Sequence, residues 1–90
     1  MDNERRKKIR IIINRLDKII DEASEQLGNL DVIMDEEQGA FDNMPEGFQV
    51  GDRGIEMEES LESLDDIHDK INESIDNLID AMNELESTFF

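Results

Sequence analysis

The sequence has no cysteine, tryptophan or tyrosine, and only one proline and four phenylalanines in 90 residues. Without cysteine there is neither a disulfide framework nor a thiolate metal site, so we expect a reducing, cytoplasmic compartment. The aromatic content of 4% is typical of helical bundles rather than β-rich folds. No apolar run approaches the roughly 20 residues that span a bilayer, so no membrane association is expected. A chain this short is also too small to enclose a deep active site.

Since the only proline is at position 45, long helices are possible on both sides of it. In each part, apolar residues recur in alternating steps of four and three. The first series is Ile9, Ile13, Leu16, Ile20, Ala23, Leu27, Leu30 and Met34. The second is Met57, Leu61, Leu64, His68, Ile71, Ile75, Leu78, Met82, Leu85 and Phe89. This spacing predicts one apolar stripe along each helix, and such a stripe needs a partner helix.

The expected helix boundaries follow from caps and breakers. Asp2 or Asn3 is suited to cap the first helix, and Pro45 disfavours helical geometry at Met44. Three glycines make Pro45 to Gly54 the only clear loop, and Asp52 is a candidate cap for the second helix. We therefore predict a single helical-hairpin domain over 1–90, with a helix over about 3–43, a loop over about 44–54 and a helix over about 55–87. Within the loop, Phe48 and Val50 are available to close the apolar end of the hairpin.

The net charge of −16 is unevenly distributed. Residues 1–18 hold seven basic groups against three acidic ones, a net charge of +4. The other 72 residues hold two basic groups against 22 acidic ones, a net charge of −20. An antiparallel hairpin brings the basic start of the first helix beside Asp80, Glu84 and Glu86. This pairing favours two long helices in an antiparallel coiled-coil hairpin, in an all-α fold.

Further apolar residues lie outside the main stripes. Ile12, Ile19, Ile33 and Ala40 form a second stripe on the first helix, and Ile67 and Ala81 widen the apolar face of the second. Two helices alone cannot bury faces this broad, so we expect a homodimer that forms a four-helix bundle. The alternative is that a different protein covers this surface. The expected interface residues are Ile12, Ile19, Ile33, Ile67, Phe89 and Phe90.

His68 stands in the second stripe, and with Asp65 it forms an Asp-x-x-His pattern. A similar Glu-x-x-His pattern occurs in di-iron bundles, but those sites need a second such motif and two more inward carboxylates. We therefore interpret His68 as a register-setting or pH-sensitive residue of the stripe. No metal ion and no other cofactor is expected.

Two acidic patterns resemble the magnesium-binding motifs of the all-α nucleotide pyrophosphohydrolases. One consists of Glu58, Glu59 and Glu62, and the other of Glu73 and Asp76. In that family the motifs face each other from separate helices, whereas here they are expected about 20 Å apart along one helix. The chain also lacks a Ser/His/Asp arrangement and a phosphate-binding loop. We interpret it as non-enzymatic, with a Mg-dependent pyrophosphohydrolase as a remote alternative.

The charge distribution indicates the class of partner. The acidic part should repel nucleic acid, so no direct nucleic-acid binding is expected. It is suited instead to a protein with a basic surface, for which acidic helices can imitate the phosphates of DNA.

The segment DEEQGAFDNMPEGFQ, residues 35–49, is followed by Gly54 and then by Met57, Glu58 and Glu59. It resembles the centre of small acidic proteins of tailed phages and prophages of Gram-positive bacteria, in which a DEEQxAFDNMPE-type segment joins two helical stretches. The resemblance covers about residues 30–65. It implies a phage protein acting in the cytoplasm of a bacterial host, where small phage proteins are often accessory factors, including inhibitors of host defence nucleases.

We therefore expect a protein–protein interaction module that modulates host defence or nucleic-acid machinery. A structural or scaffolding coiled-coil protein is the alternative. The candidate partner-binding residues surround the loop and the start of the second helix: Glu46, Phe48, Asp52, Arg53, Glu58, Glu59 and Glu62.

Overall fold

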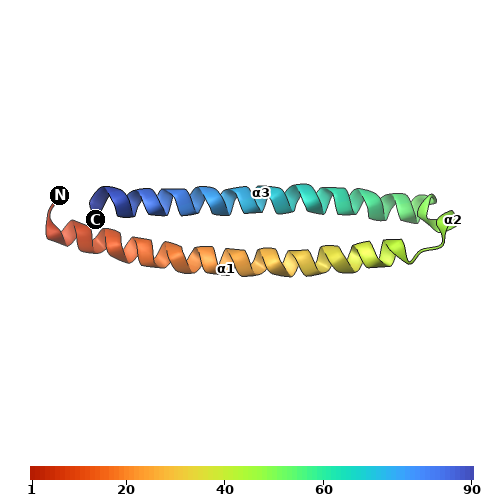
Figure 1. The fold of residues 1–90 in the computed structure, drawn as a ribbon, viewed down its shortest axis with the longest axis horizontal. Helices are drawn as coiled ribbons and strands as arrows, with labels where there is room; N and C mark the ends of the chain where they lie inside the picture. The colour runs from red at the N-terminus through yellow and green to blue at the C-terminus, as the bar shows by residue number, and fades with distance from the viewer. The chain divides into compact units, whose positions relative to one another are not determined.

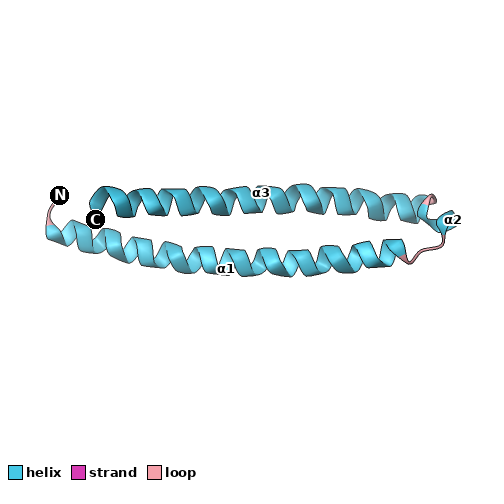
Figure 2. Ribbon diagram, viewed as in Figure 1, coloured by secondary structure: helices cyan, strands magenta, loops and turns pink.

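The computed structural model describes all 90 residues and contains three helices and no strand. The helices are α1 (Asn3–Asp42), α2 (Glu46–Gln49) and α3 (Asp52–Phe89), of 40, 4 and 38 residues. Figures 1 and 2 show α1 and α3 as long helices with α2 in the connection between them. The all-α class and the two long helices are confirmed.

The chain divides into two compact units, and α1 and α3 each contribute to both. The terminal unit consists of Met1–Gln26 and Asn72–Phe90, and the turn unit of Leu27–Ile71. None of the helices is long and apolar enough to cross a membrane.

In the terminal unit the start of α1 runs antiparallel to the end of α3, and the two chain ends lie close together (Figure 1). The Asp2 carboxylate caps α1, because its Oδ1 accepts a hydrogen bond of 2.8 Å from the backbone N–H of Arg5. Arg10 Nη1 lies 3.1 Å from Glu86 Oε1, which confirms that the basic start of α1 meets Glu86. Both side chains are exposed, so the pair contributes only about 0.2–1 kcal/mol.

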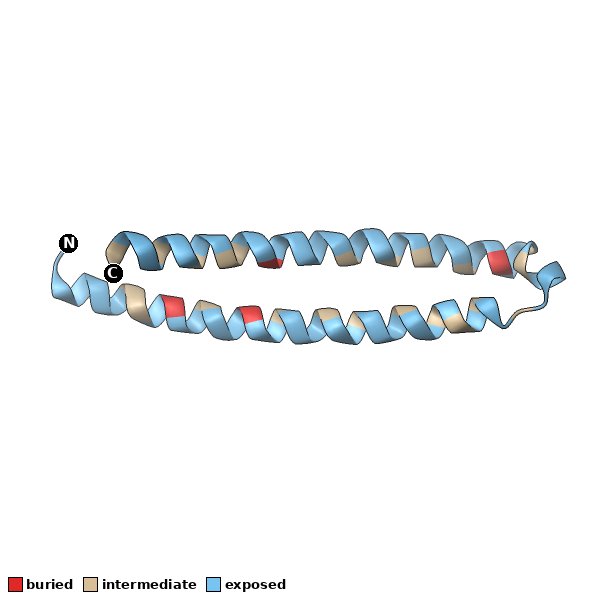
Figure 3. Ribbon diagram, viewed as in Figure 1, coloured by how far each residue is buried: buried red, intermediate tan, exposed pale blue.

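The core of the terminal unit is thin. Ile13, Ile20 and Ile75 are the only buried hydrophobic residues of the chain, at 4%, 6% and 7% exposure (Figure 3). The other residues of the two apolar stripes are half-buried, except Ile71, which is 36% exposed. The heptad pattern therefore identifies the packed face correctly, but two helices alone cover it incompletely.

In the turn unit, the end of α1 is closed by a side chain from the connection. Gln49 Nε2 donates hydrogen bonds to the carbonyl oxygens of Phe41, at 3.0 Å, and of Met44, at 3.1 Å. Carbonyl groups at a helix end have no partner within the helix. The Phe41 carbonyl, in the last turn of α1, also accepts the backbone N–H of Met44, so Gln49 gives it a second donor and gives the Met44 carbonyl one. The backbone N–H groups of Phe48 and Gln49 both donate to the carbonyl of Pro45, which starts α2.

The connection is closed by backbone rather than by apolar side chains. Phe48 and Val50 are 66% and 77% exposed, so the expectation that they close the end of the hairpin is wrong. Gly54 is buried instead, and α3 begins at Asp52, inside the expected loop. A Cβ at Gly54 would lie 2.5 Å from the carbonyl oxygen of Phe48 and closer still to that of Gln49. Only glycine allows so close an approach, which leaves Phe48 and Val50 no space beneath the turn.

The flanks of the stripes form two different edges. We assign Ile13, Ile20 and Ile75 to position a of the seven-residue repeat abcdefg, so that the apolar stripe occupies positions a and d. In an antiparallel helix pair, the e positions of both helices lie along one edge of this stripe and the g positions along the other. In the terminal unit Arg10 and Glu86 meet at the e edge. In the turn unit the e residues Gln38, Glu58 and Asp65 line one common groove. The g positions therefore form the opposite edge of each unit.

Candidate protein-interaction surfaces

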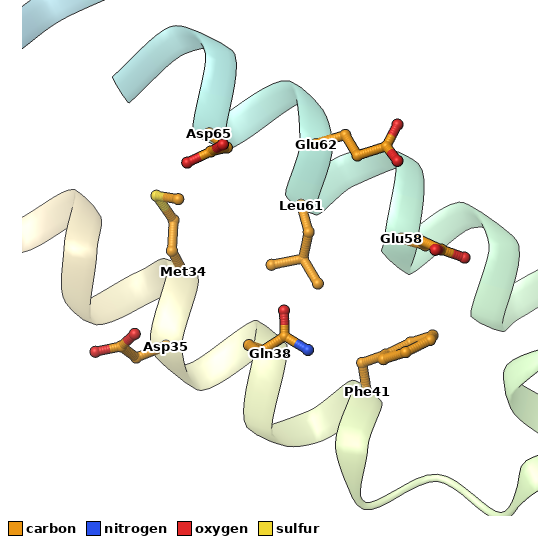
Figure 4. A pocket seen from close by; sticks show the side chains of 8 residues that line it. All are labelled: Met34, Asp35, Gln38, Phe41, Glu58, Leu61, Glu62 and Asp65. Carbon is orange, nitrogen blue, oxygen red and sulfur yellow. The ribbon is translucent and has the colours of Figure 1, made fainter. Parts of the chain in front are cut away.

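The e edge of the turn unit carries a shallow groove of about 380 Å³. Figure 4 shows Leu61 directed from α3 toward α1, with Met34 and Phe41 on either side of it. These three apolar side chains form the floor. The remaining lining residues are polar and come from both helices: Asp35, Gln38, Glu58, Glu62 and Asp65.

Every charged residue that lines this groove is acidic. Gln38 is its only neutral polar residue, and its amide donates a hydrogen bond of 2.9 Å to Asp42 Oδ1. An apolar floor with an acidic rim is suited to an apolar side chain flanked by lysine or arginine. It is not suited to an anionic ligand such as nucleic acid.

His68 meets Asp31 within the turn unit. His68 Nε2 is shielded from solvent and lies 2.7 Å from Asp31 Oδ1, while Nδ1 lies 3.7 Å from Asp69 Oδ1. Although 2.7 Å is short enough for a hydrogen bond, the Nε2 contact is not aligned as one. No group of three or more histidine or acidic side chains comes together in a way that could hold a metal ion.

The candidate partner-binding residues lie on several sides of the turn unit. Glu58 and Glu62 line the acidic groove, whereas Glu59 lies beside Ser60 and Ser63 on another side of α3. Arg53 lines a small depression with Glu37 and Glu56. Three further candidates are exposed at the turn: Glu46, Phe48 and Asp52.

The expected interface isoleucines are all exposed, and the terminal phenylalanines differ from each other. Exposure is 50% for Ile12, 51% for Ile19, 53% for Ile33 and 47% for Ile67. Phe89 is half-buried in the apolar stripe. The ring of Phe90 is 54% exposed, but the Arg10 guanidinium carbon lies 4.0 Å from its centroid. Phe90 therefore contributes to the end of the terminal unit through a cation–π contact.

Inspection of the sequence missed a second, charged heptad on α3. Seven exposed carboxylates follow one another in alternating steps of three and four on the side opposite the apolar stripe. This acid strip consists of Glu59, Glu62, Asp66, Asp69, Glu73, Asp76 and Asp80. On a helix the steps place successive carboxylates about 5 Å apart along the axis. The signal for the strip is the spacing of Asp and Glu along α3, which is separate from the spacing of the apolar residues. The groove residues Asp35, Gln38 and Asp65 were missed because they flank the stripe rather than the loop.

Comparisons with protein-family models, with curated proteins and with solved structures find no match to this chain.

Proposed function

We propose that the chain is a non-enzymatic protein-interaction module that acts as a homodimeric four-helix bundle and binds a basic protein surface. The acid strip of α3 is the observation that carries this proposal. The strip holds one carboxylate per about 5 Å along the helix axis, compared with one phosphate per about 3.4 Å of axis for a single DNA strand. A protein surface that binds a nucleic-acid backbone therefore meets a comparable row of negative charges.

The strip lowers the stability of its own helix, which supports a role outside folding. Like charges three or four residues apart destabilise a helix by about 0.2–0.5 kcal/mol per pair. The strip contains six such successive pairs, and α3 has only Arg53 and Lys70 as basic residues. A basic partner relieves this repulsion on binding. The strip therefore lowers the stability of α3 but raises the affinity and the association rate for such a partner.

The phage resemblance of residues 35–49 supports the choice of partner class. In a bacterial host cell, a basic nucleic-acid enzyme of the defence or replication machinery presents the required surface. The acidic groove of the turn unit supplies a second point of attachment with an apolar floor.

Affinity capture of the chain from phage-infected host cells tests the proposal. We expect stoichiometric recovery of a nucleic-acid-binding protein. This protein should dissociate from the chain as the salt concentration is raised, because salt screens contacts between exposed charges. Recovery of virion proteins alone would contradict the proposal and favour the alternative, a scaffolding coiled-coil protein. That alternative is supported by the exposed isoleucines, which suit assembly of like chains.

The Mg-dependent pyrophosphohydrolase remains a remote alternative. Its test is magnesium-dependent hydrolysis of a nucleotide panel that is abolished by Glu59→Gln. We expect no hydrolysis, because its two acidic patterns lie on a single helix fourteen residues apart.

A further inference from the structure

The g positions differ from every other outward position of the helices because none of them holds a carboxylate, although Glu37, Glu56 and Glu84 lie beside the edge. On α1 the g positions are Arg5, Ile12, Ile19, Gln26, Ile33 and Ala40. On α3 they are Arg53, Ser60, Ile67, Ser74, Ala81 and Thr88. With 25 acidic residues in 90, twelve positions would hold about three by chance. The outward positions b, c, e and f all include acidic residues.

The same edge carries large exposed apolar side chains in both units. In the terminal unit Ile12 and Ile19 are about half exposed, and Ala81 lies on the same edge from α3. In the turn unit Ile33 and Ile67 are exposed to a similar degree. The small side chains of Ala81 and Thr88 leave a shallow depression of about 210 Å³, which Glu84, Leu85 and Phe89 also line. This alternation of large and small residues is what interlocking helix packing requires.

We infer that a second copy of this chain docks on the g edge, so that two helix pairs form a bundle through these edges. This inference rests on the homodimer of the proposed function and assigns its interface. The acid strip and the acidic groove lie on other sides and stay open to a partner.

Charge decides in favour of a second copy over a basic protein. Each copy carries a net charge of −16, so contact through any other outward side brings acidic residues of one copy against those of the next. A basic partner gains nothing from positions without carboxylates. A two-fold symmetric contact uses the same patch on both copies, and the g positions bring no carboxylate of one copy against one of the other.

The degree of burial is consistent with a missing partner. A second copy also covers the half-buried stripe, of which only three residues are buried without it.

Sedimentation equilibrium of the full chain tests the interface without any other protein. The expected mass is twice 10.4 kDa for the wild type. Ile19→Glu and Ile67→Glu should each raise the dimer Kd by at least about 30-fold, the effect of losing one central contact. Ile11→Glu and Val32→Glu are matched controls, because these residues are 52% and 55% exposed at position f, away from the g edge. Their mass should stay that of the dimer.

Alkylation of single cysteines gives a second readout that does not depend on a destabilising change. The chain has no cysteine, so Ala81→Cys reports on the g edge and Asn83→Cys on position b. The Cys side chain of the Ala81→Cys variant should be alkylated more slowly as the protein concentration rises, because dimerisation covers it. The alkylation rate of the Asn83→Cys variant should not change. A monomeric wild type at about 100 μM, or equal effects of the g and f variants, would overturn the inference. Failure to capture a basic partner would leave it standing.

Discussion

Asp31 of α1 and His68 of α3 meet across the turn unit, where Asp31 Oδ1 lies 2.7 Å from His68 Nε2. This contact aligns His68 with the turn of α1 that contains Asp31. A histidine in an apolar stripe costs stability but favours one register, because only one alignment of the helices brings it to a carboxylate.

The first prediction concerns this pair. A double-mutant cycle with His68→Ala and Asp31→Ala, followed by urea unfolding, should give a coupling of about 0.2–1 kcal/mol, because Asp31 is exposed and the contact is poorly aligned. His68→Leu should raise the free energy of unfolding by about 1 kcal/mol, because it extends the apolar stripe. A loss of stability in His68→Leu would show that the imidazole does more than set register.

The second prediction concerns Gly54. Gly54→Ala should lower the free energy of unfolding by at least about 1–3 kcal/mol, because the new methyl group would overlap the carbonyls of Phe48 and Gln49. Gly28→Ala is the control, since its Cβ meets nothing within 4 Å inside α1. It should raise stability by up to about 1 kcal/mol. Thermal unfolding of both variants measures the difference, and equal effects would contradict the close approach at Gly54.

The third prediction concerns the amide that closes α1. Gln49→Ala should lower stability by about 1–2 kcal/mol, because the Met44 carbonyl loses the donor that Gln49 supplies and the Phe41 carbonyl keeps only the Met44 N–H. Gln38→Ala removes an exposed side-chain bond to Asp42 and should cost less than about 0.5 kcal/mol. Amide hydrogen exchange near Met44 should rise in the Gln49 variant alone. Unchanged exchange there would mean that water satisfies the carbonyls equally well.

The fourth prediction compares two adjacent isoleucines. Ile20 is 6% exposed and Ile19 is 51% exposed. Ile20→Ala should cost about 2–5 kcal/mol at any protein concentration. The effect of Ile19→Ala should be smaller and should grow with protein concentration, because its contacts form in the dimer. Urea unfolding at two concentrations measures both effects, and an Ile19 effect independent of concentration would argue against burial of this residue between copies.

The sequence predicts the packed face of this protein because the heptad spacing is local and unbroken. The stripe residues are buried or half-buried from Ile9 through Met34, and from Met57 through Phe89 apart from Ile71. The turn was harder to predict. The roles of Gln49 and Gly54 depend on which backbone atoms approach them in space, and residue type alone does not indicate that.

The candidate interaction surfaces also divide into one that residue spacing predicts and one that depends on how the two helices pack. The acid strip is fully encoded in the spacing of Asp and Glu along α3. The groove required the two helices to be placed side by side, because Met34 and Leu61 come from different helices. Helix register therefore limits what the sequence alone reveals about a site.

The central claim is that the acid strip is the partner-binding surface. The most direct test is to measure the affinity of a captured partner for two variants that have equal net charge. One variant neutralises the strip through Asp66→Asn, Glu73→Gln, Asp76→Asn and Asp80→Asn. The other neutralises four exposed acids of α1 through Asp17→Asn, Asp21→Asn, Glu22→Gln and Glu25→Gln. We predict that the strip variant weakens binding by at least about tenfold, and the α1 variant by less than about threefold. Equal losses in the two variants would contradict the claim, because net charge alone would then account for binding.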